Sequence, residues 1–170
     1  MKSSITYPAE DVVLGILEIG NGREAEKQGE RELLKQMLGY NVVLNHNEDG
    51  KPLIERYNIS ISHTKGFVAI LLSKGLEVGI DIEYHSDRIQ KIARRFLRPD
   101  EIYTTTSDLL IAWCAKEAAY KLFSEEHLTY QEMKVDISEN QLINLKTTIT
   151  INFVPSIHSE YVIVMCWANK

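Results

Sequence analysis

The chain has 170 residues, of which 44% are hydrophobic, and a formal net charge of −5. This length fits one globular unit or two small, tightly packed halves, with enough apolar residues for a hydrophobic core. The negative charge argues against non-specific nucleic-acid binding. Because no apolar run approaches the roughly 20 residues that span a bilayer and no signal-peptide pattern is present, we expect a cytoplasmic protein without membrane or nucleic-acid partners.

The first part of the chain is predicted to hold strands and one helix. Residues 11–19 are rich in Val, Ile and Leu and end at a Gly-Asn-Gly turn, which indicates a strand. Residues 23–38 contain good helix formers and are followed by a glycine, which indicates a helix. Residues 58–62 alternate apolar and polar side chains and indicate a strand, with a loop over residues 62–66.

Two strongly apolar runs follow, over residues 67–73 and 77–83. Both are typical of central strands. Lys74 and Gly75 lie between them and are typical of a tight turn, so we expect the two strands to pair as a hairpin.

The second part of the chain is predicted to begin with two helices. Asp87 is expected to cap a helix over residues 88–97, and Ser107 or Asp108 a second helix that reaches about Phe123. Four short strand-like runs follow, at residues 133–137, 141–145, 147–153 and 161–167. A helix beside a small antiparallel sheet in each half predicts an α+β fold, with an N-terminal half over residues 1–75 and a C-terminal half over residues 76–170.

The two cysteines, Cys114 and Cys166, have apolar or aromatic neighbours in the sequence. Such neighbours are typical of buried free thiols. A disulfide would better suit a secreted chain, and no Cys/His spacing suggests a zinc site. We therefore expect two free thiols.

Asp81 and Glu83 stand two positions apart in the run over residues 77–83, so both side chains point to one face of a strand. Two carboxylates on one face repel each other unless positive charge lies between them. A divalent cation such as Mg²⁺ would supply that charge, because it prefers oxygen ligands. The pair alone also fits an exposed strand end in water.

The predicted helix that ends near Phe123 is apolar nearly all round, which indicates that it is mostly buried. Glu117 and Lys121 interrupt its buried stripe, which is costly unless the two charges pair with each other or bind something. Both interpretations stay open at this point. Lys116 lies off this face and is expected to extend outward to solvent.

Together these charges suit Mg²⁺ bound to a diphosphate. Mg²⁺ takes a few carboxylates together with phosphate oxygens and water, and phosphoryl transfer depends mainly on positioning and charge neutralisation. A lysine beside the metal can hold a phosphate oxygen or the leaving group. His63, in a predicted loop, could donate to a phosphate or could be a solvated side chain.

Four segments occur in the order in which a known family carries them: Gly-Lys-Pro at 50–52, Ile-Ser-His-Thr at 61–64, Val-Gly-Ile-Asp-Ile-Glu at 78–83 and Trp-Cys-Ala-Lys-Glu-Ala-Ala-Tyr-Lys at 113–121. With these segments the chain resembles the 4'-phosphopantetheinyl transferase superfamily, in its larger, surfactin-synthetase-activating class. The two acidic segments are specific when they occur together at this distance. Arg31, before paired leucines, adds a likeness in the first helix.

The resemblance implies a holo-[acyl-carrier-protein] synthase. Such an enzyme transfers the 4'-phosphopantetheine group of coenzyme A to a serine of an apo acyl or peptidyl carrier protein and releases 3',5'-ADP. It also implies two similar α+β halves related by a pseudo-twofold axis, with coenzyme A in the cleft between them. The implied oligomeric state is a monomer.

The resemblance also implies roles for named residues. Asp81, Glu83 and Glu117 would bind Mg²⁺ with the coenzyme A pyrophosphate, and Lys121 would stabilise charge on that pyrophosphate. Glu117 or a metal-bound water would take the proton of the carrier serine. His63 would contact the 3'-phosphate. The full set of implied coenzyme A-binding residues is Lys51, Pro52, Ser62, His63 and Arg31.

The predicted helix over residues 88–97 and its end carry five basic side chains: Arg88, Lys91, Arg94, Arg95 and Arg98. Carrier proteins are typically acidic around the modified serine, so we expect part of this helix to meet the carrier; a solvated charged face is the alternative. Two other functions would use the same carboxylates, a Mg²⁺-dependent phosphohydrolase and a non-catalytic relative that binds coenzyme A or a carrier. The segments at 50–52 and 62–64 argue against the first, and the retained charged residues argue against the second.

Overall fold

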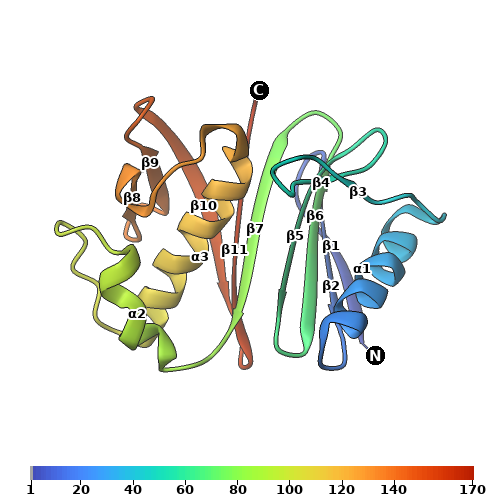
Figure 1. Ribbon diagram of the computed structural model, residues 1–170, viewed down its shortest axis with the longest axis horizontal. Coiled ribbons are helices and arrows are strands. Elements are labelled where there is room, and N and C mark those ends of the chain that lie inside the picture. Colours follow the sequence, from blue (N-terminus) through green and yellow to red (C-terminus); the bar gives the residue numbers. More distant parts are fainter. Residues whose placement is uncertain (1) are drawn as a thin grey trace.

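Two antiparallel sheets pack face to face, and each carries helices on its outer side (Figure 1). The computed structural model describes residues 2–170. The predicted α+β fold class is confirmed, with layers in the order helix, sheet, sheet, helix. Within the described residues, no helix is both long and apolar enough to cross a membrane.

The first sheet has the strand order β1-β2-β6-β5, and helix α1 packs on β2 and β6. As predicted, this helix ends at Gly39, whose φ of 81° is a left-handed conformation that suits glycine. The short hairpin β3–β4 leads into β5. The elements are β1 (Ser3–Ala9), β2 (Val12–Glu18), α1 (Arg23–Leu38), β3 (Asn45–His46), β4 (Pro52–Leu53), β5 (Asn58–Thr64) and β6 (Phe67–Ser73).

The second sheet has the strand order β7-β11-β10-β9-β8, and helix α3 packs on β7 and β11. Helix α2 packs on α3 from the outside. The four strand-like runs predicted after the helices are all present. The elements are β7 (Glu77–Tyr84), α2 (Arg88–Phe96), α3 (Thr106–Leu122), the 3-10 helices η1 (Ser124–Glu126) and η2 (Tyr130–Glu132), β8 (Met133–Asp136), β9 (Gln141–Asn144), β10 (Ile149–Ile157) and β11 (Tyr161–Ala168).

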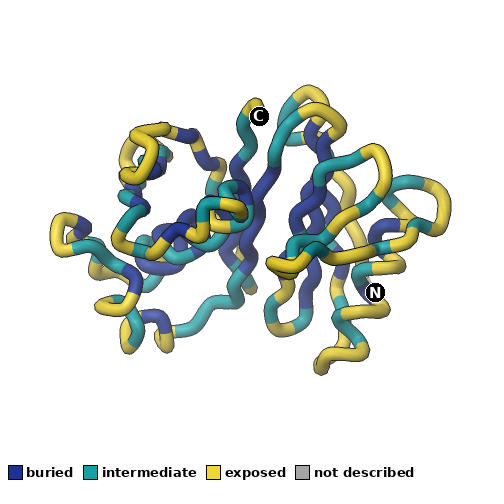
Figure 2. Tube along the Cα trace, turned by 45° about the horizontal axis from the view of Figure 1, so that its top comes forward, coloured by how far each residue is buried: buried dark blue, intermediate teal, exposed yellow. Residues whose placement is uncertain are grey.

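Strand β6 is buried along its whole length because its two faces meet different layers. Val68 and Ile70 pack against α1, whereas Ala69 faces the second sheet. Ile80 and Ile82 of β7 enter the same inter-sheet core, so the opposite face of β7 is the one that meets α3. Figure 2 shows the buried residues concentrated along these central strands.

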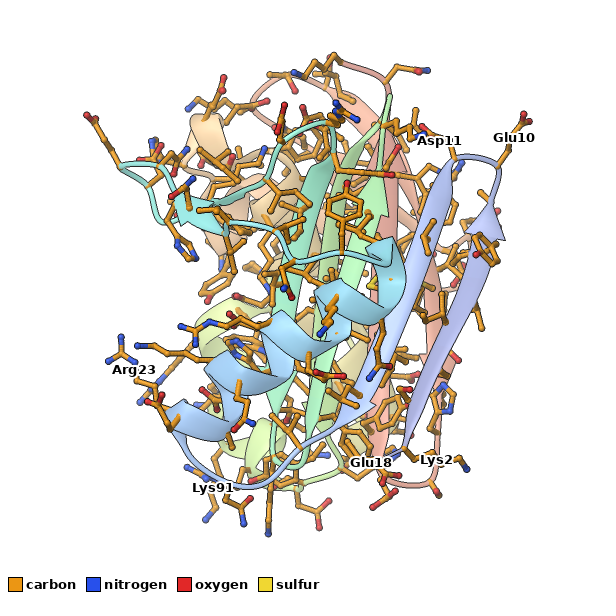
Figure 3. The ribbon with its side chains drawn as sticks, turned by 90° about the vertical axis from the view of Figure 1, so that its right-hand side faces the viewer. Lys2, Glu10, Asp11, Glu18, Arg23 and Lys91 are labelled. Atoms are coloured by element: carbon orange, nitrogen blue, oxygen red, sulfur yellow. The ribbon has the colours of Figure 1, made fainter. Side chains whose placement is uncertain are left out.

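The predicted hairpin between β6 and β7 is wrong. Strand β6 pairs with β2 along one edge and with β5 along the other, so it has no free edge for β7, which pairs with β11. The turn after β6 instead crosses from one sheet to the other. Asp11, at the β1–β2 turn (Figure 3), fixes the crossing, because its Oδ2 accepts hydrogen bonds from the Ser73 hydroxyl and the Gly75 N–H, both at 2.8 Å.

Side-chain hydroxyls of β5 join the two sheets. Alternate residues of β5 point toward the outer edge of β7, and three of their hydroxyls accept hydrogen bonds of 2.9–3.2 Å from β7 N–H groups: Ser60 from Ile80, Ser62 from Ile82 and Thr64 from Tyr84. The predicted loop over residues 62–66 is therefore wrong for residues 62–64, which continue β5. We call this set of three hydrogen bonds the hydroxyl seam.

The predicted cap of α3 is wrong, whereas Asp87 stands at the predicted N-cap position of α2 but without a capping hydrogen bond. The hydroxyl of Thr105 caps α3 by accepting a hydrogen bond from the Asp108 N–H at 3.1 Å. Asp87 makes no capping hydrogen bond, and its carboxylate accepts one from the Thr106 hydroxyl at 2.8 Å. Strand β1 was not predicted, because its residues are mostly exposed at the edge of the first sheet and form no apolar run.

Candidate active site

The face of β7 that meets α3 carries Gly79, Asp81 and Glu83, because alternate residues of a strand share a face. A Cβ atom at Gly79 would lie 2.0 Å from the carbonyl oxygen of Ala118. The glycine therefore allows α3 to approach the strand closely. This approach brings the two carboxylates of β7 next to the charged side chains of α3.

Lys121 reaches from α3 to β7. Its Nζ lies 3.1 Å from Oδ1 of Asp81 and 2.8 Å from the carbonyl oxygen of Ile80. Glu117, one turn earlier, accepts a hydrogen bond at Oε1 from the Tyr130 hydroxyl at 2.9 Å. Among the described residues the two α3 charges therefore do not form the i, i+4 ion pair that the sequence left open.

The other contacts of the β7 carboxylates also use one oxygen of each group. The Ser62 hydroxyl donates to Oδ1 of Asp81 at 2.9 Å, and the indole N–H of Trp113 donates to Oε1 of Glu83 at 3.1 Å. Oδ2 of Asp81 is buried and has no hydrogen-bond partner among the described residues. An unpaired buried carboxylate oxygen is costly, so this oxygen is available to a group from outside the chain.

Burial and mutual repulsion raise the pKa values of the neighbouring carboxyl groups. Burial, with the charge of Asp81 as the next cause, raises the pKa of Glu83 from 4.5 to about 7. Burial, again followed by the charge of Asp81, raises the pKa of Glu117. Carboxylates that destabilise each other's charge at close range favour a cation between them.

The sequence pattern of the 4'-phosphopantetheinyl transferase superfamily matches residues 77–166. This span is more than half of the chain and runs from β7 through α3 into β11. The chain belongs to the 4'-phosphopantetheinyl transferase superfamily. The resemblance seen in the sequence is thereby confirmed, and the activity class is transfer of phosphopantetheine. A search of curated proteins gives no match.

The acidic cluster of this phosphopantetheinyl transferase, Asp81, Glu83 and Glu117, fits a divalent cation in its charge and its donor atoms. Among residues 2–170, no group of three or more His, Cys, Asp or Glu side chains is arranged so that it could hold a metal ion as it stands. The fit depends instead on the unpaired Oδ2 of Asp81 and on the raised pKa values of the two glutamates. A bound cation would give Oδ2 of Asp81 a partner and would lower the raised pKa values of the two glutamates.

Two cavities flank the acidic cluster of the transferase. The first, of about 150 Å³, is lined by residues 49–52 and by Lys121, among others. The second, of about 310 Å³, is lined by Glu83 together with the basic side chains of Arg88 and Lys91. The first cavity therefore reaches Lys121, and the second reaches Glu83.

Two of the predicted coenzyme A-binding residues line the first cavity. Lys51 and Pro52 line it and also a neighbouring cavity of about 520 Å³. The Nζ of Lys51 lies 3.0 Å from Oε2 of Glu77, the first residue of β7. The charge of Lys51 is therefore partly neutralised by this carboxylate. These residues and Lys121 come from different halves of the chain and share one cavity.

Ser62 and His63 point to opposite faces of β5. Ser62 is buried and bonds Asp81, whereas Nε2 of His63 lies 2.5 Å from Oε1 of Glu30 on α1. Arg31 follows on α1 and is exposed. Within the described part of the chain, Ser62 is thus the one member of the predicted coenzyme A-binding set that hydrogen-bonds the acidic cluster.

The predicted exposure of Lys116 is wrong. Its side chain is 0% exposed, and its Nζ lies 2.6 Å from Oε1 of Glu101. Tyr130, which bonds Glu117, was also missed by the sequence analysis, because it lies in an irregular segment with no periodic pattern. The indole N–H of Trp113 could have been found, since Trp113 precedes Glu117 by four residues and so shares its face of the helix.

Proposed function

We propose that this protein transfers the 4'-phosphopantetheine group of coenzyme A to a serine of an acyl or peptidyl carrier protein, with Mg²⁺, as a holo-[acyl-carrier-protein] synthase. One observation carries the proposal. Asp81, paired with Lys121, has a buried Oδ2 with no partner from the described chain, and its charge contributes to the raised pKa values of Glu83 and Glu117. A diphosphate held by a divalent cation supplies the positive charge and the ligand atoms that such a cluster needs.

In this proposal Asp81, Glu83 and Glu117 hold the cation. Mg²⁺, when bound, would neutralise the diphosphate charge that develops during phosphoryl transfer. Lys121 lies 3.1 Å from Asp81 and would add a second positive charge on the side of the smaller cavity. Ser62 and Trp113 would keep the two β7 carboxylates in place through the oxygens that they already bond.

The reaction forms one bond and breaks one. The hydroxyl oxygen of the carrier serine bonds the phosphorus atom that bears pantetheine, and the bond from that phosphorus to the bridging oxygen breaks. The leaving 3',5'-ADP takes the electron pair of the broken bond. Glu117 is proposed to take the serine proton as the general base.

The two cavities suggest where each substrate lies. The smaller cavity, with Lys51, Pro52 and Lys121, would hold coenzyme A together with the neighbouring cavity of about 520 Å³ that shares Lys51 and Pro52. The 1–75 and 76–170 halves would then each supply part of the coenzyme A site. His63 and Arg31 are proposed to reach the 3'-phosphate from the first half. The pseudo-twofold relation between the halves, the monomeric state and a cytoplasmic location also belong to this proposal.

The larger cavity would accept the carrier. Its basic side chains, Arg88 and Lys91, lie beside Glu83, and its apolar lining includes Ile92 and Leu110. This arrangement fits an acidic helix that carries a serine. Arg94 does not line this cavity, so the basic face that we assign to the carrier is narrower than the sequence suggested.

Mass spectrometry of candidate apo-carriers incubated with the protein, Mg²⁺ and coenzyme A tests the proposal. We expect a mass gain of one phosphopantetheine group, which Asp81→Ala and Glu117→Ala abolish. The control Glu139→Ala changes an exposed carboxylate outside the cluster and should leave the gain unchanged. Coenzyme A cleavage without carrier modification would indicate a phosphohydrolase, and coenzyme A binding without either would indicate a non-catalytic relative.

A further inference from the structure

A fully buried positive charge lies directly beside Glu117 on α3. The side chain of Lys116 is 0% exposed, and its Nζ donates to three acceptors: Oε1 of Glu101 at 2.6 Å, the carbonyl oxygen of Phe96 at 2.6 Å and that of Tyr130 at 3.1 Å. The proposed transfer uses neither Lys116 nor Glu101. The function of the Glu101–Lys116 ion pair therefore depends on the segments that these hydrogen bonds connect.

The partner carboxylate, Glu101, is as buried as the lysine. Its Oε1 also accepts a hydrogen bond from the Arg98 N–H, and its Oε2 accepts one from the Val135 N–H, both at 2.7 Å. The Glu101–Lys116 ion pair thereby joins the end of α2, the segment between α2 and α3, η2 and β8. These are the elements that surround Tyr130.

Tyr130 connects this ion pair to the acidic cluster. Lys116 holds its main-chain oxygen, while its hydroxyl donates to Oε1 of Glu117 at 2.9 Å. Its ring packs on Trp113, with ring centroids 5.6 Å apart, and Trp113 in turn donates to Glu83. Tyr130 therefore hydrogen-bonds one glutamate of the cluster and contacts the hydrogen-bond donor of the other.

We propose that Tyr130 is a positioning residue of the site and that the Glu101–Lys116 ion pair holds it in place. The Tyr130 hydroxyl bonds Oε1 of Glu117 and so leaves Oε2 for the cation. This inference rests on the proposed Mg²⁺-dependent transfer. Hydrogen-bonding partners of metal ligands typically change metal affinity by about 10- to 100-fold when removed. A buried ion pair adds little net stability compared with apolar residues of similar size. We therefore assign the Glu101–Lys116 pair the role of fixing the position of Tyr130.

Tyr130→Phe tests the inference because it removes only the hydroxyl and keeps the ring on Trp113. Mn²⁺ binding to the protein alone, followed by electron paramagnetic resonance of free Mn²⁺, should weaken by about 10-fold. The Mg²⁺ concentration for half-maximal transfer should rise in parallel, while KM for the carrier stays unchanged. Tyr103→Phe is the matched control, since it also removes a hydrogen-bonded hydroxyl, which donates to the carbonyl oxygen of Val135 and accepts from the Ile137 N–H, but which makes no contact with the cluster.

Glu101→Gln tests the link to the ion pair. It should weaken Mn²⁺ binding in the parent protein but not further in Tyr130→Phe, because both changes act through the same hydroxyl. Equal Mn²⁺ affinity in the parent, Tyr130→Phe and Tyr103→Phe would overturn the inference even if the parent transfers phosphopantetheine normally. A parent that binds Mn²⁺ but modifies no carrier would overturn the proposed function, and the affinity comparison would still decide the role of Tyr130.

Discussion

The close contact between β7 and α3 predicts a large effect of Gly79→Ala. The new Cβ would lie 2.0 Å from the carbonyl oxygen of Ala118 and 2.9 Å from its carbonyl carbon, both main-chain atoms of a buried helix. Reaching a separation of 3.0–3.4 Å from that oxygen requires a movement of about 1.0–1.4 Å. The helix must move away from the strand, because a carbonyl group cannot turn aside as a flexible side chain can.

Two consequences follow from this displacement of α3. Overpacking of a well-packed core costs about 1–3 kcal/mol, which for a chain of this size lowers the melting temperature by roughly 2–4 °C per kcal/mol. A displacement of about 1 Å in a catalytic group can slow a reaction by about 100-fold, and Glu117 would move with the helix. Transfer to the carrier should therefore decrease far more than the loss of stability explains at 25 °C.

Urea unfolding and initial transfer rates measure the two effects separately. Gly20→Ala is the control, since its Cβ would meet its nearest neighbour, Ala25, at an ordinary 3.7 Å, and it should change the free energy of unfolding by less than about 0.5 kcal/mol. If Gly79→Ala matches Gly20→Ala in both unfolding and transfer, then the glycine does not set the distance between β7 and α3, and the reasoning is wrong.

Three further predictions concern charged groups. Lys116→Met leaves the Glu101 carboxylate buried and should cost about 3–5 kcal/mol in the free energy of unfolding, measured in urea; a loss below about 1 kcal/mol would contradict a buried pair. Because the folded-state pKa of Glu83 is about 7, above its ordinary 4.5, the folded protein binds more protons than the unfolded chain between these values. Without divalent metal, the free energy of unfolding should therefore decrease from pH 4.5 to 7, by at most about 3 kcal/mol, and be flat above pH 7 with respect to this group. The double variant Arg88→Glu/Lys91→Glu should raise KM for an acidic carrier by about 10-fold or more and leave KM for coenzyme A unchanged.

Each of these has its own control. Glu83→Gln should flatten the decrease in stability between pH 4.5 and 7, and an unchanged slope would show that another group is responsible. Arg94→Glu reverses the charge of a basic side chain of α2 that does not line the larger cavity, and it should leave KM for the carrier close to that of the parent. If Arg94→Glu raises KM for the carrier as much as the double variant does, the carrier contacts a broader surface than the lining of the larger cavity.

The elements with clear apolar periodicity could be predicted from the sequence, because their pattern is local. Helix α1 and strand β6 have the predicted bounds. The pairing of β7 could not be predicted, since it depends on β11, which follows it by more than 70 residues. A short turn after an apolar strand indicates a hairpin only when that strand has a free edge, and β6 has none.

The acidic cluster shows the same division between local and distant information. Alternation placed Asp81 and Glu83 on one face, and helical spacing placed Glu117 in a buried stripe. The partner of Lys116 lies 15 residues before it in an irregular segment, so no spacing rule indicates that this lysine is buried. The contact of Tyr130 with Glu117 depends likewise on the packing of η2 against α3.

The hydroxyl seam has a consequence for how the two edges of β7 are held. Strand β7 is joined to β11 by a main-chain ladder, but to β5 by side-chain hydroxyls, which accept from the N–H groups of Ile80, Ile82 and Tyr84. A hydroxyl can rotate and exchange its partner for water, which a main-chain carbonyl within a ladder cannot do. We therefore expect amide hydrogen exchange to be faster at these three residues than at the residues between them. Exchange at the seam would leave intact the main-chain ladder that joins β7, the strand of Asp81, to its own sheet.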